Sequence, residues 1–168
     1  MRSFSQGFSY GRVLKVQKVA VIALIKNKDY YLIVNHFNRG WDIPGGYINE
    51  GEDIVSALKR EVFEETNFVV KNYSLKVIFS NIQPEILKGE KILKIIFGFV
   101  CDFASGTFLK NKEVSEYKFI KKEEAKKYIS NKLQLTRFYD LINAKEQLLY
   151  IAYQKTPYIE LVREIITN

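Results

Sequence analysis

The sequence is poor in cysteine, histidine and proline, with one, one and three of these residues among 168. The single thiol, Cys101, cannot form a disulfide within the chain, which suits a reducing compartment. No apolar run approaches the roughly 18 residues that cross a bilayer. The first seven residues lack the apolar core of a signal peptide. From these absences we expect a cytoplasmic protein that does not span a membrane.

Disorder and a multidomain architecture are excluded by composition and length. Hydrophobic residues make up 47% of the chain and aromatic residues 14%, which is too apolar for a disordered segment. A chain of 168 residues can bury one sizeable core. We find no internal repeat and no low-complexity linker. The sequence therefore predicts a single domain over residues 1–168.

The net charge is +7, and the lysines that produce it are scattered along the chain. Their field attracts polyanions such as nucleotides. No basic run is interleaved densely enough with aromatic residues to form a nucleic-acid platform. We expect small anionic partners and no nucleic acid, while the composition leaves both a monomer and a homodimer open.

The N-terminal half has the pattern of β-strands. Residues 20–25 form a continuous apolar run, as expected for a strand that is covered on both faces. Residues 1–12 are consistent with a loose arm or an edge strand. Further strands are expected at residues 30–34, 68–70, 73–79, 92–101 and 117–120, and loops at residues 36–40, 82–91 and 102–112. A short helix is expected at residues 121–129.

The C-terminal part has a helical period. Apolar residues from Leu133 to Ala152 favour helices, and Thr156-Pro157 resembles a helix cap followed by a first-turn proline. This pair predicts a last helix that runs through Ile165. Strands around a central helix, with helices at the end, predict an α/β sandwich with a mixed sheet. Residues 131–168 would be a helical extension of a core at about 13–130.

The central helix, expected over residues 53–66, carries a row of carboxylates. Each helical residue turns the direction by about 100°, so Glu61, Glu64 and Glu65 project within an arc of roughly 100°. Like charges at these spacings repel each other, and Glu64 and Glu65 also lie at the negative end of the helix dipole. A bound Mg²⁺ or Mn²⁺ would relieve both costs. The alternative is a solvated acidic face, with lysine and arginine neighbours as partial partners.

The spacing of this segment resembles the Nudix box. That pattern reads Gly, five residues, Glu, seven residues, Arg-Glu, an aliphatic residue, any residue, Glu-Glu, any residue, Gly and an aliphatic residue. The matching positions are Gly46, Glu52, Arg60, Glu61, Val62, Glu64, Glu65, Asn67 and Phe68. Asn67 replaces the usual glycine, and asparagine is the next best residue in the left-handed conformation at a helix end. The resemblance implies a Nudix-like α/β/α sandwich.

The resemblance also implies a reaction, which is the Mg²⁺-dependent (or Mn²⁺-dependent) hydrolysis of a nucleoside diphosphate linked to another moiety. The implied metal ligands are Glu61, Glu64, Glu65 and the carbonyl of Gly45. Glu52 and Arg60 are expected to connect the glycine loop, which is residues 45–52, to the helix. Family members often add a carboxylate from a later loop, and Glu113 and Glu116 both match that place. Either could be a general base or a ligand.

Other candidate residues carry weaker signals. His36, the only histidine, could touch a phosphate, but a loop histidine is more often a bystander. Trp41 could stack on a base, although packing against the box is the stronger expectation. Pro84 stands where some ADP-ribose-cleaving relatives have a proline. Nucleoside triphosphates and ADP-ribose-like compounds therefore both remain candidate substrates.

Two further functions remain open from the sequence. One is a non-catalytic Nudix-fold module that binds or senses a nucleotide. The other is an interaction domain that works through the C-terminal helices. The intact set of three helix carboxylates favours the enzyme, because a pure binder has no need to keep all three.

Overall fold

The computed structural model describes residues 18–84 and 91–167, which form nine strands and four helical elements. The strands are β1 (Lys18–Asn27), β2 (Tyr30–His36), β3 (Gly40–Asp42), β4 (Gly45–Tyr47), β5 (Phe68–Pro84), β6 (Lys91–Gly106), β7 (Val114–Ile120), β8 (Leu148–Gln154) and β9 (Ile159–Ile166). The helices are α1 (Ile54–Thr66), η1 (Lys122–Glu124), α2 (Ala125–Tyr128) and α3 (Lys132–Asn143). No helix in the described part of the chain is both long and apolar enough to cross a membrane.

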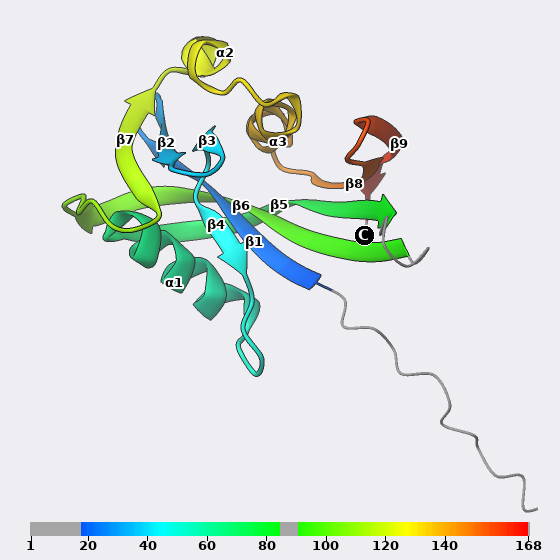
Figure 1. The fold of residues 1–168 in the computed structure, drawn as a ribbon, viewed down its shortest axis with the longest axis horizontal. Helices are drawn as coiled ribbons and strands as arrows, with labels where there is room; N and C mark the ends of the chain where they lie inside the picture. Colours follow the sequence, from blue (N-terminus) through cyan, green and yellow to red (C-terminus); the bar gives the residue numbers. More distant parts are fainter. Residues whose placement is uncertain (1–17, 85–90, 168) are drawn as a thin grey trace, which may run out of the picture.

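The strands form one mixed sheet with helices on both faces. The main order is β3-β2-β1-β6-β5-β8-β9, with β4 paired to β1 and β7 paired to β2. The β1–β6 and β5–β8 pairs are parallel and the others are antiparallel. Figure 1 shows α1 on one side of the sheet and α2 and α3 on the other. The predicted α/β sandwich with a mixed sheet is confirmed.

Strand β1 shows why the sheet carries two cores. Successive side chains of a strand point to opposite faces. Ala20 and Leu24 therefore join the core beneath α3, whereas Val21, Ala23 and Ile25 join the core beneath α1. All five side chains are buried. The structure therefore confirms that the apolar run forms a strand covered on both faces.

Helix α1 matches its predicted bounds closely because both ends are capped. The Asp53 carboxylate accepts hydrogen bonds from the backbone N–H groups of Val55 and Ser56, which have no partner inside the helix. At the other end Asn67 takes the left-handed conformation, with φ 60° and ψ 24°. Leu58 and Val62 pack into the core from the helix face toward the sheet. These caps fix where the carboxylates lie relative to the glycine loop.

We predict that Asn67→Gly changes the free energy of unfolding by less than about 1 kcal/mol. Glycine enters the left-handed region without a Cβ penalty. It also loses the hydrogen bond that Asn67 Nδ2 donates to the Thr107 carbonyl at 2.9 Å, an exposed bond of modest value. Asn67→Ala, which loses the bond and keeps the penalty, should be the less stable variant in urea unfolding. A larger loss in the glycine variant would mean that the bond to Thr107 outweighs the backbone strain.

The C-terminal extension differs from its prediction. Helix α3 is present, but residues 148–154 form strand β8 and residues 159–166 form strand β9, where we predicted helices. Thr156-Pro157 lies in the turn between these strands and does not begin a helix. Short apolar runs are compatible with either structure, and here β5 offers an edge along which β8 pairs in parallel. The predicted helical extension is therefore wrong in its second half.

Strands β5 and β6 are longer than predicted. Residues 68–70 and 73–79 belong to one strand that runs to Pro84, and β6 continues through the expected loop as far as Gly106. Irregularities in the β5–β6 register, between Lys71 and Ser74 among others, let one strand pass through the predicted break. Strand β7 also begins three residues earlier than expected. The expected N-terminal arm and residues 85–90 of the expected loop lie outside the described residues.

Candidate active site

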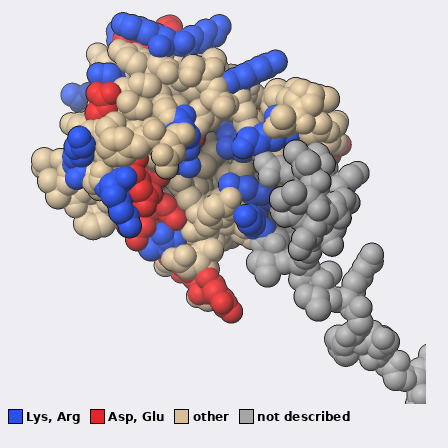
Figure 2. Space-filling view, viewed as in Figure 1, with Lys and Arg blue, Asp and Glu red and all other residues tan. Residues whose placement is uncertain are grey.

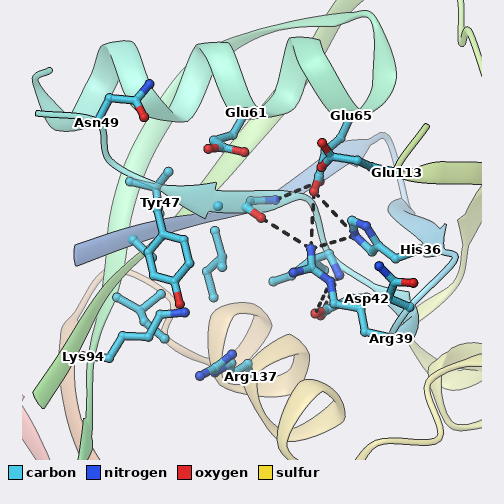
Figure 3. Close-up of a pocket in the computed structure, with 18 of the residues that line it drawn as sticks. His36, Arg39, Asp42, Tyr47, Asn49, Glu61, Glu65, Lys94, Glu113 and Arg137 are labelled. Carbon is cyan, nitrogen blue, oxygen red and sulfur yellow. Dashed lines mark hydrogen bonds and ion pairs between the residues drawn. The ribbon is translucent and has the colours of Figure 1, made fainter. Parts of the chain in front are cut away.

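A cleft with a volume of about 590 Å³ lies between the glycine loop, α1 and the sheet. Its lining residues come from β1, β2, β3, β4, α1, β6, α3 and four loops. Among the polar ones are His36, Arg39, Asp42, Glu61, Glu65, Lys94, Glu113 and Arg137. Figure 3 shows Glu61 and Glu65 projecting from α1 on one side of the cleft, with Lys94 and Arg137 on the opposite side. The cleft thus has an acidic end and a basic end.

Glu65 is the most deeply buried carboxylate of the acidic end, with a residue exposure of 4%. Its Oε2 accepts a hydrogen bond from the Gly45 backbone N–H at 3.0 Å, and Arg39 Nη2 lies 3.3 Å from its Oε1. Burial raises the pKa of Glu65 to about 8, although the Arg39 charge and the Gly45 hydrogen bond act in the opposite direction. A cation bound beside Glu65 would therefore stabilise the charged form of its carboxylate.

Glu61 lies one turn before Glu65 and faces the glycine loop. Burial raises the pKa of its carboxyl, and the charges of Glu64 and Glu113 add to that effect, while Arg60 opposes it. Gly46 is required at the facing position, because a Cβ on Gly46 would overlap the Glu61 carboxylate. The glycine of the box therefore makes room for the carboxylate of the helix.

Arg60 connects the loop to the helix through several hydrogen bonds. Its Nε and Nη2 each donate to the Glu52 carboxylate at 2.8 Å, which is a two-pronged ion pair. Its Nη2 also donates to the Tyr47 carbonyl, and its Nη1 donates to Glu61 and Glu64. Hydrogen bonding to Arg60 lowers the pKa of Glu52 to about 2. The contact that the sequence predicts between Glu52 and Arg60 is present.

The third helix carboxylate, Glu64, lies apart from the other two. Its side chain is 58% exposed and pairs with Arg60 at 3.1 Å across one helical turn. It is not among the residues that line the cleft, which include Glu61 and Glu65. The carboxylates that share the predicted arc therefore divide into two that face the cleft and one on its rim.

His36 and Arg39 make a larger contribution to the cleft than the sequence indicates. His36 is 7% exposed, and Arg39 Nη2 lies 2.8 Å from its Nε2. Burial, together with the Arg39 charge, lowers the pKa of His36 to about 4, so the ring is neutral at pH 7. Because arginine can only donate, His36 Nε2 accepts and the ring proton is on Nδ1. Arg39 also lies 3.4 Å from the Gly45 carbonyl oxygen.

Of Glu113, which lies in the loop before β7, and Glu116, which lies in β7 itself, only Glu113 lines the cleft. Asn111 brings this loop to α1, since its Nδ2 donates to the carbonyls of Glu64 and Glu65 at the helix end. Its Oδ1 accepts from the backbone N–H of Glu113. Glu116 is directed elsewhere and accepts a hydrogen bond from Asn35 Nδ2 at 3.1 Å. The tertiary structure separates two residues that the sequence leaves equivalent.

Other residues of the cleft belong to no sequence motif, and the sequence alone did not identify them as candidate site residues. Arg39 sits in a polar loop, and Lys94 and Arg137 come from elements far away in the chain. Only their convergence in space marks them. Trp41 is half-buried and packs against the core beneath α3, where its ring lies 5.5 Å from that of Tyr128 of α2, so the expected packing against the box is not observed.

The donor atoms of the acidic end fit a hard divalent cation. Carboxylate oxygens of Glu61 and Glu65 and the Gly45 backbone line one cleft, and Mg²⁺ and Mn²⁺ prefer oxygen ligands. The raised pKa values of both glutamates mark carboxylates that a positive charge would stabilise. Within residues 18–84 and 91–167, no three acidic, histidine or cysteine side chains are gathered as a ready ion cage. In the structure the Glu61 carboxylate accepts a hydrogen bond from Arg60, and the Glu65 carboxylate accepts one from the Gly45 backbone N–H.

A glycine loop, an acidic helix and a mixed sheet between helices are the features of one family of hydrolases. The model of the NUDIX domain matches residues 16–141 of this chain. The chain belongs to that family, and it is a Nudix hydrolase.

Individual relatives act on nucleotides. The nucleoside triphosphatase NudI of Salmonella agona is 32% identical over 133 residues, which cover 68% of this chain and 89% of that protein. The 8-oxo-dGTP diphosphatase of Buchnera aphidicola is 35% identical over 75 residues, or 44% of this chain and 56% of that protein. The crystal structure of the MutT protein from Bacillus halodurans superposes with a TM-score of 0.69 at 25% identity, covering 88% of this chain and 97% of that chain.

Proposed function

We propose that this Nudix hydrolase cleaves the pyrophosphate bond of a small nucleotide with Mg²⁺ or Mn²⁺, and that nucleoside triphosphates are its first candidate substrates. The observation that carries the proposal is the placement of Glu61 and Glu65 beside Gly45 in one cleft. Two relatives whose names denote nucleoside triphosphate and 8-oxo-dGTP hydrolysis support the substrate class.

The proposed mechanism assigns distinct tasks to the residues of the cleft. The bound metal would neutralise phosphate charge and lower the pKa of the attacking water. Glu61, Glu65 and the Gly45 carbonyl would hold it, with Glu64 joining from the rim. Glu52 supports this arrangement indirectly, because it fixes Arg60 against both the loop and Glu61.

The base that takes the proton from water is assigned to a carboxylate of the cleft. Glu113 enters from the loop and its charge influences Glu61, so it lies close enough to serve this end of the cleft. Neutral His36 accepts a hydrogen bond from Arg39, and this bond keeps the arginine beside Glu65. We therefore assign His36 a positioning task and consider Glu113 the base or a further ligand.

We expect Glu113→Gln to lower kcat at least tenfold and Glu116→Gln to leave it within about twofold. Glutamine keeps the size of the side chain but can neither take a proton nor neutralise a cation. Such general-base contributions are commonly 10²–10⁴-fold. Steady-state kinetics of both variants on the best substrate provides the measurement. Equal losses in both variants would contradict the placement of the loop.

The proposal is tested by assaying phosphate, pyrophosphate and nucleotide release over a panel of substrates. The panel contains the nucleoside triphosphates, their 8-oxo derivatives and ADP-ribose, each with Mg²⁺ and with EDTA. We expect metal-dependent turnover of at least one member. Tight binding without turnover of any member would instead support the non-catalytic nucleotide-binding module.

A further inference from the structure

A row of polar residues crosses the sheet at the basic end of the cleft. Lys18 of β1 and Lys94 of β6 are register partners, and Lys94 is in turn the partner of Asn81 on β5. Register partners project from the same face of a sheet. This row lies on the face that α3 covers, where it lines a second hollow of about 490 Å³ together with Gln134 and Arg137 of α3.

The second hollow joins the catalytic cleft. Both are lined by Arg39, Asp42, Tyr47, Lys94 and Arg137. The second hollow adds Lys18 and Lys155, and among the described residues that line it Asp42 alone is acidic. Burial raises the pKa of the Asp42 carboxyl, while the charges of Arg39 and Arg137 act in the opposite direction. The basic end therefore has a large excess of positive charge.

Three lysines converge on Tyr47. The Lys94 ammonium lies 4.3 Å from the centroid of the Tyr47 ring, and the Lys18 ammonium 5.7 Å. Burial alone would raise the pKa of the Tyr47 hydroxyl. The charge of Lys94 and its hydrogen bond to Tyr47, followed by the charges of Lys18 and Lys155, outweigh burial and lower the pKa. Neighbouring ammonium groups repel each other, and none of the three has a carboxylate partner among the described residues. An anion in the hollow would remove this repulsion.

Buried polar atoms without partners line the same hollow. Asn81 is 2% exposed, and its Oδ1 has no hydrogen-bond partner within residues 18–84 and 91–167. Within the same ranges, Oε1 of Gln134 and Nε of Arg137 are also buried without a partner. Gln134 Nε2 already donates to Asp42, which leaves its oxygen as an acceptor. Unpaired buried polar atoms cost stability unless a ligand or water pairs with them. Charge and hydrogen-bonding capacity thus coincide in one place.

We propose that this hollow binds a phosphate group of the substrate other than the one attacked at the acidic end. A phosphate offers the negative charge that the lysines need and acceptors for the Nε–H of Arg137. The amide oxygens of Asn81 and Gln134 would accept from hydroxyl or amino groups beside that phosphate. Figure 2 shows basic side chains gathered at the hollow and a stripe of acidic side chains to one side of it. This inference rests on the proposed function, because it names a second contact of the same substrate.

The distal phosphate has two possible sources, which are the end of a polyphosphate chain and the ribose of a dinucleotide. Matched pairs that differ by one phosphate distinguish them, namely ATP against ADP and NADP⁺ against NAD⁺. We expect the wild-type enzyme to favour the phosphate-rich member of one pair at least tenfold in kcat/KM. The double variant K18Q/K155Q should reduce that preference at least fivefold. Lys126→Gln, an exposed lysine of α2 outside both hollows, is the matched control and should retain it.

Binding of inorganic tripolyphosphate in EDTA, measured by calorimetry, separates this inference from the proposed function. We expect K18Q/K155Q to bind it at least tenfold more weakly than the wild type and the control variant. Weakened binding in an enzyme that hydrolyses none of the panel would refute the proposed function and retain the anion site. Equal binding in all three proteins, or an unchanged preference in the double variant, would overturn the inference.

Discussion

Replacing Glu65 by glutamine is expected to lower kcat by a factor of 100 or more, which corresponds to about 2.7 kcal/mol in the barrier. Glutamine keeps the shape of the side chain and removes the negative charge that would hold a cation. Its oxygen can still accept the hydrogen bond that the Gly45 backbone N–H gives to Glu65. Stability without metal should therefore hold near neutral pH, where the wild-type carboxyl is largely protonated, and rise above pH 8, where the cost of burying its charge exceeds the gain from Arg39.

Glu52→Gln is the informative comparison for this prediction. Glu52 accepts two hydrogen bonds from Arg60 and one from the Asn49 backbone N–H. Losing its charge should lower the unfolding midpoint as well as kcat, because Arg60 then lacks its main partner. Both quantities are measured for both variants, with EDTA present during unfolding. If Glu65→Gln lowers the unfolding midpoint and leaves kcat unchanged, the acidic face is structural.

The same residue gives an expected pH dependence of stability in EDTA. The pKa of Glu65 is raised from 4.5 to about 8 in the folded protein, so folding favours the protonated carboxyl. Its contribution is fully present below pH 4.5 and is lost as the pH rises through about 8. Denaturant unfolding from pH 5 to 9 should show this decline in the wild type and a smaller one in Glu65→Gln. Parallel curves for the two proteins would contradict a raised pKa of the buried Glu65 carboxyl.

Gly46→Ala is expected to lower kcat at least tenfold with little loss of stability. The new methyl group would overlap the Glu61 carboxylate, which is the movable end of a side chain. The helix and the sheet can therefore remain in place while Glu61 leaves its position beside the loop. A displaced candidate metal ligand reduces turnover without unfolding the protein.

Gly45→Ala provides the contrast to this variant. Gly45 has a φ of 151°, and a Cβ there would press on the backbone of β1 at Val21 and Ile22. Backbone cannot yield as a side-chain tip does, so this variant should lose stability first. Thermal unfolding and kcat, measured side by side, separate the two effects. A Gly46→Ala enzyme with full activity would remove Glu61 from the proposed mechanism.

The sequence by itself determined the acidic helix and the loop before it. Their features are local, because caps, glycine positions and the spacing of carboxylates depend on residues within about twenty positions of each other. Asp53 and Asn67 end the helix as their side-chain chemistry requires. The apolar run of β1 likewise predicts a buried strand, since burial on both faces leaves no polar alternation.

Only the tertiary structure decided which candidates share a site. Glu61 and Glu65 face the cleft and Glu64 does not, because α1 presents only one side to the glycine loop. Glu113 enters the cleft and Glu116 does not, because Asn111 fixes the loop to the end of α1.

The C-terminal strands were also decided by tertiary contacts. Residues 148–154 and 159–166 are apolar enough for either helix or strand. Strand β8 forms because the edge of β5 supplies backbone partners, and β9 pairs along β8 in turn. Tertiary contacts also produce the row of polar residues that crosses the sheet. Lys18 is far from Asn81 and Lys94 in the chain, and only the parallel pairing of β1 with β6 places it beside them.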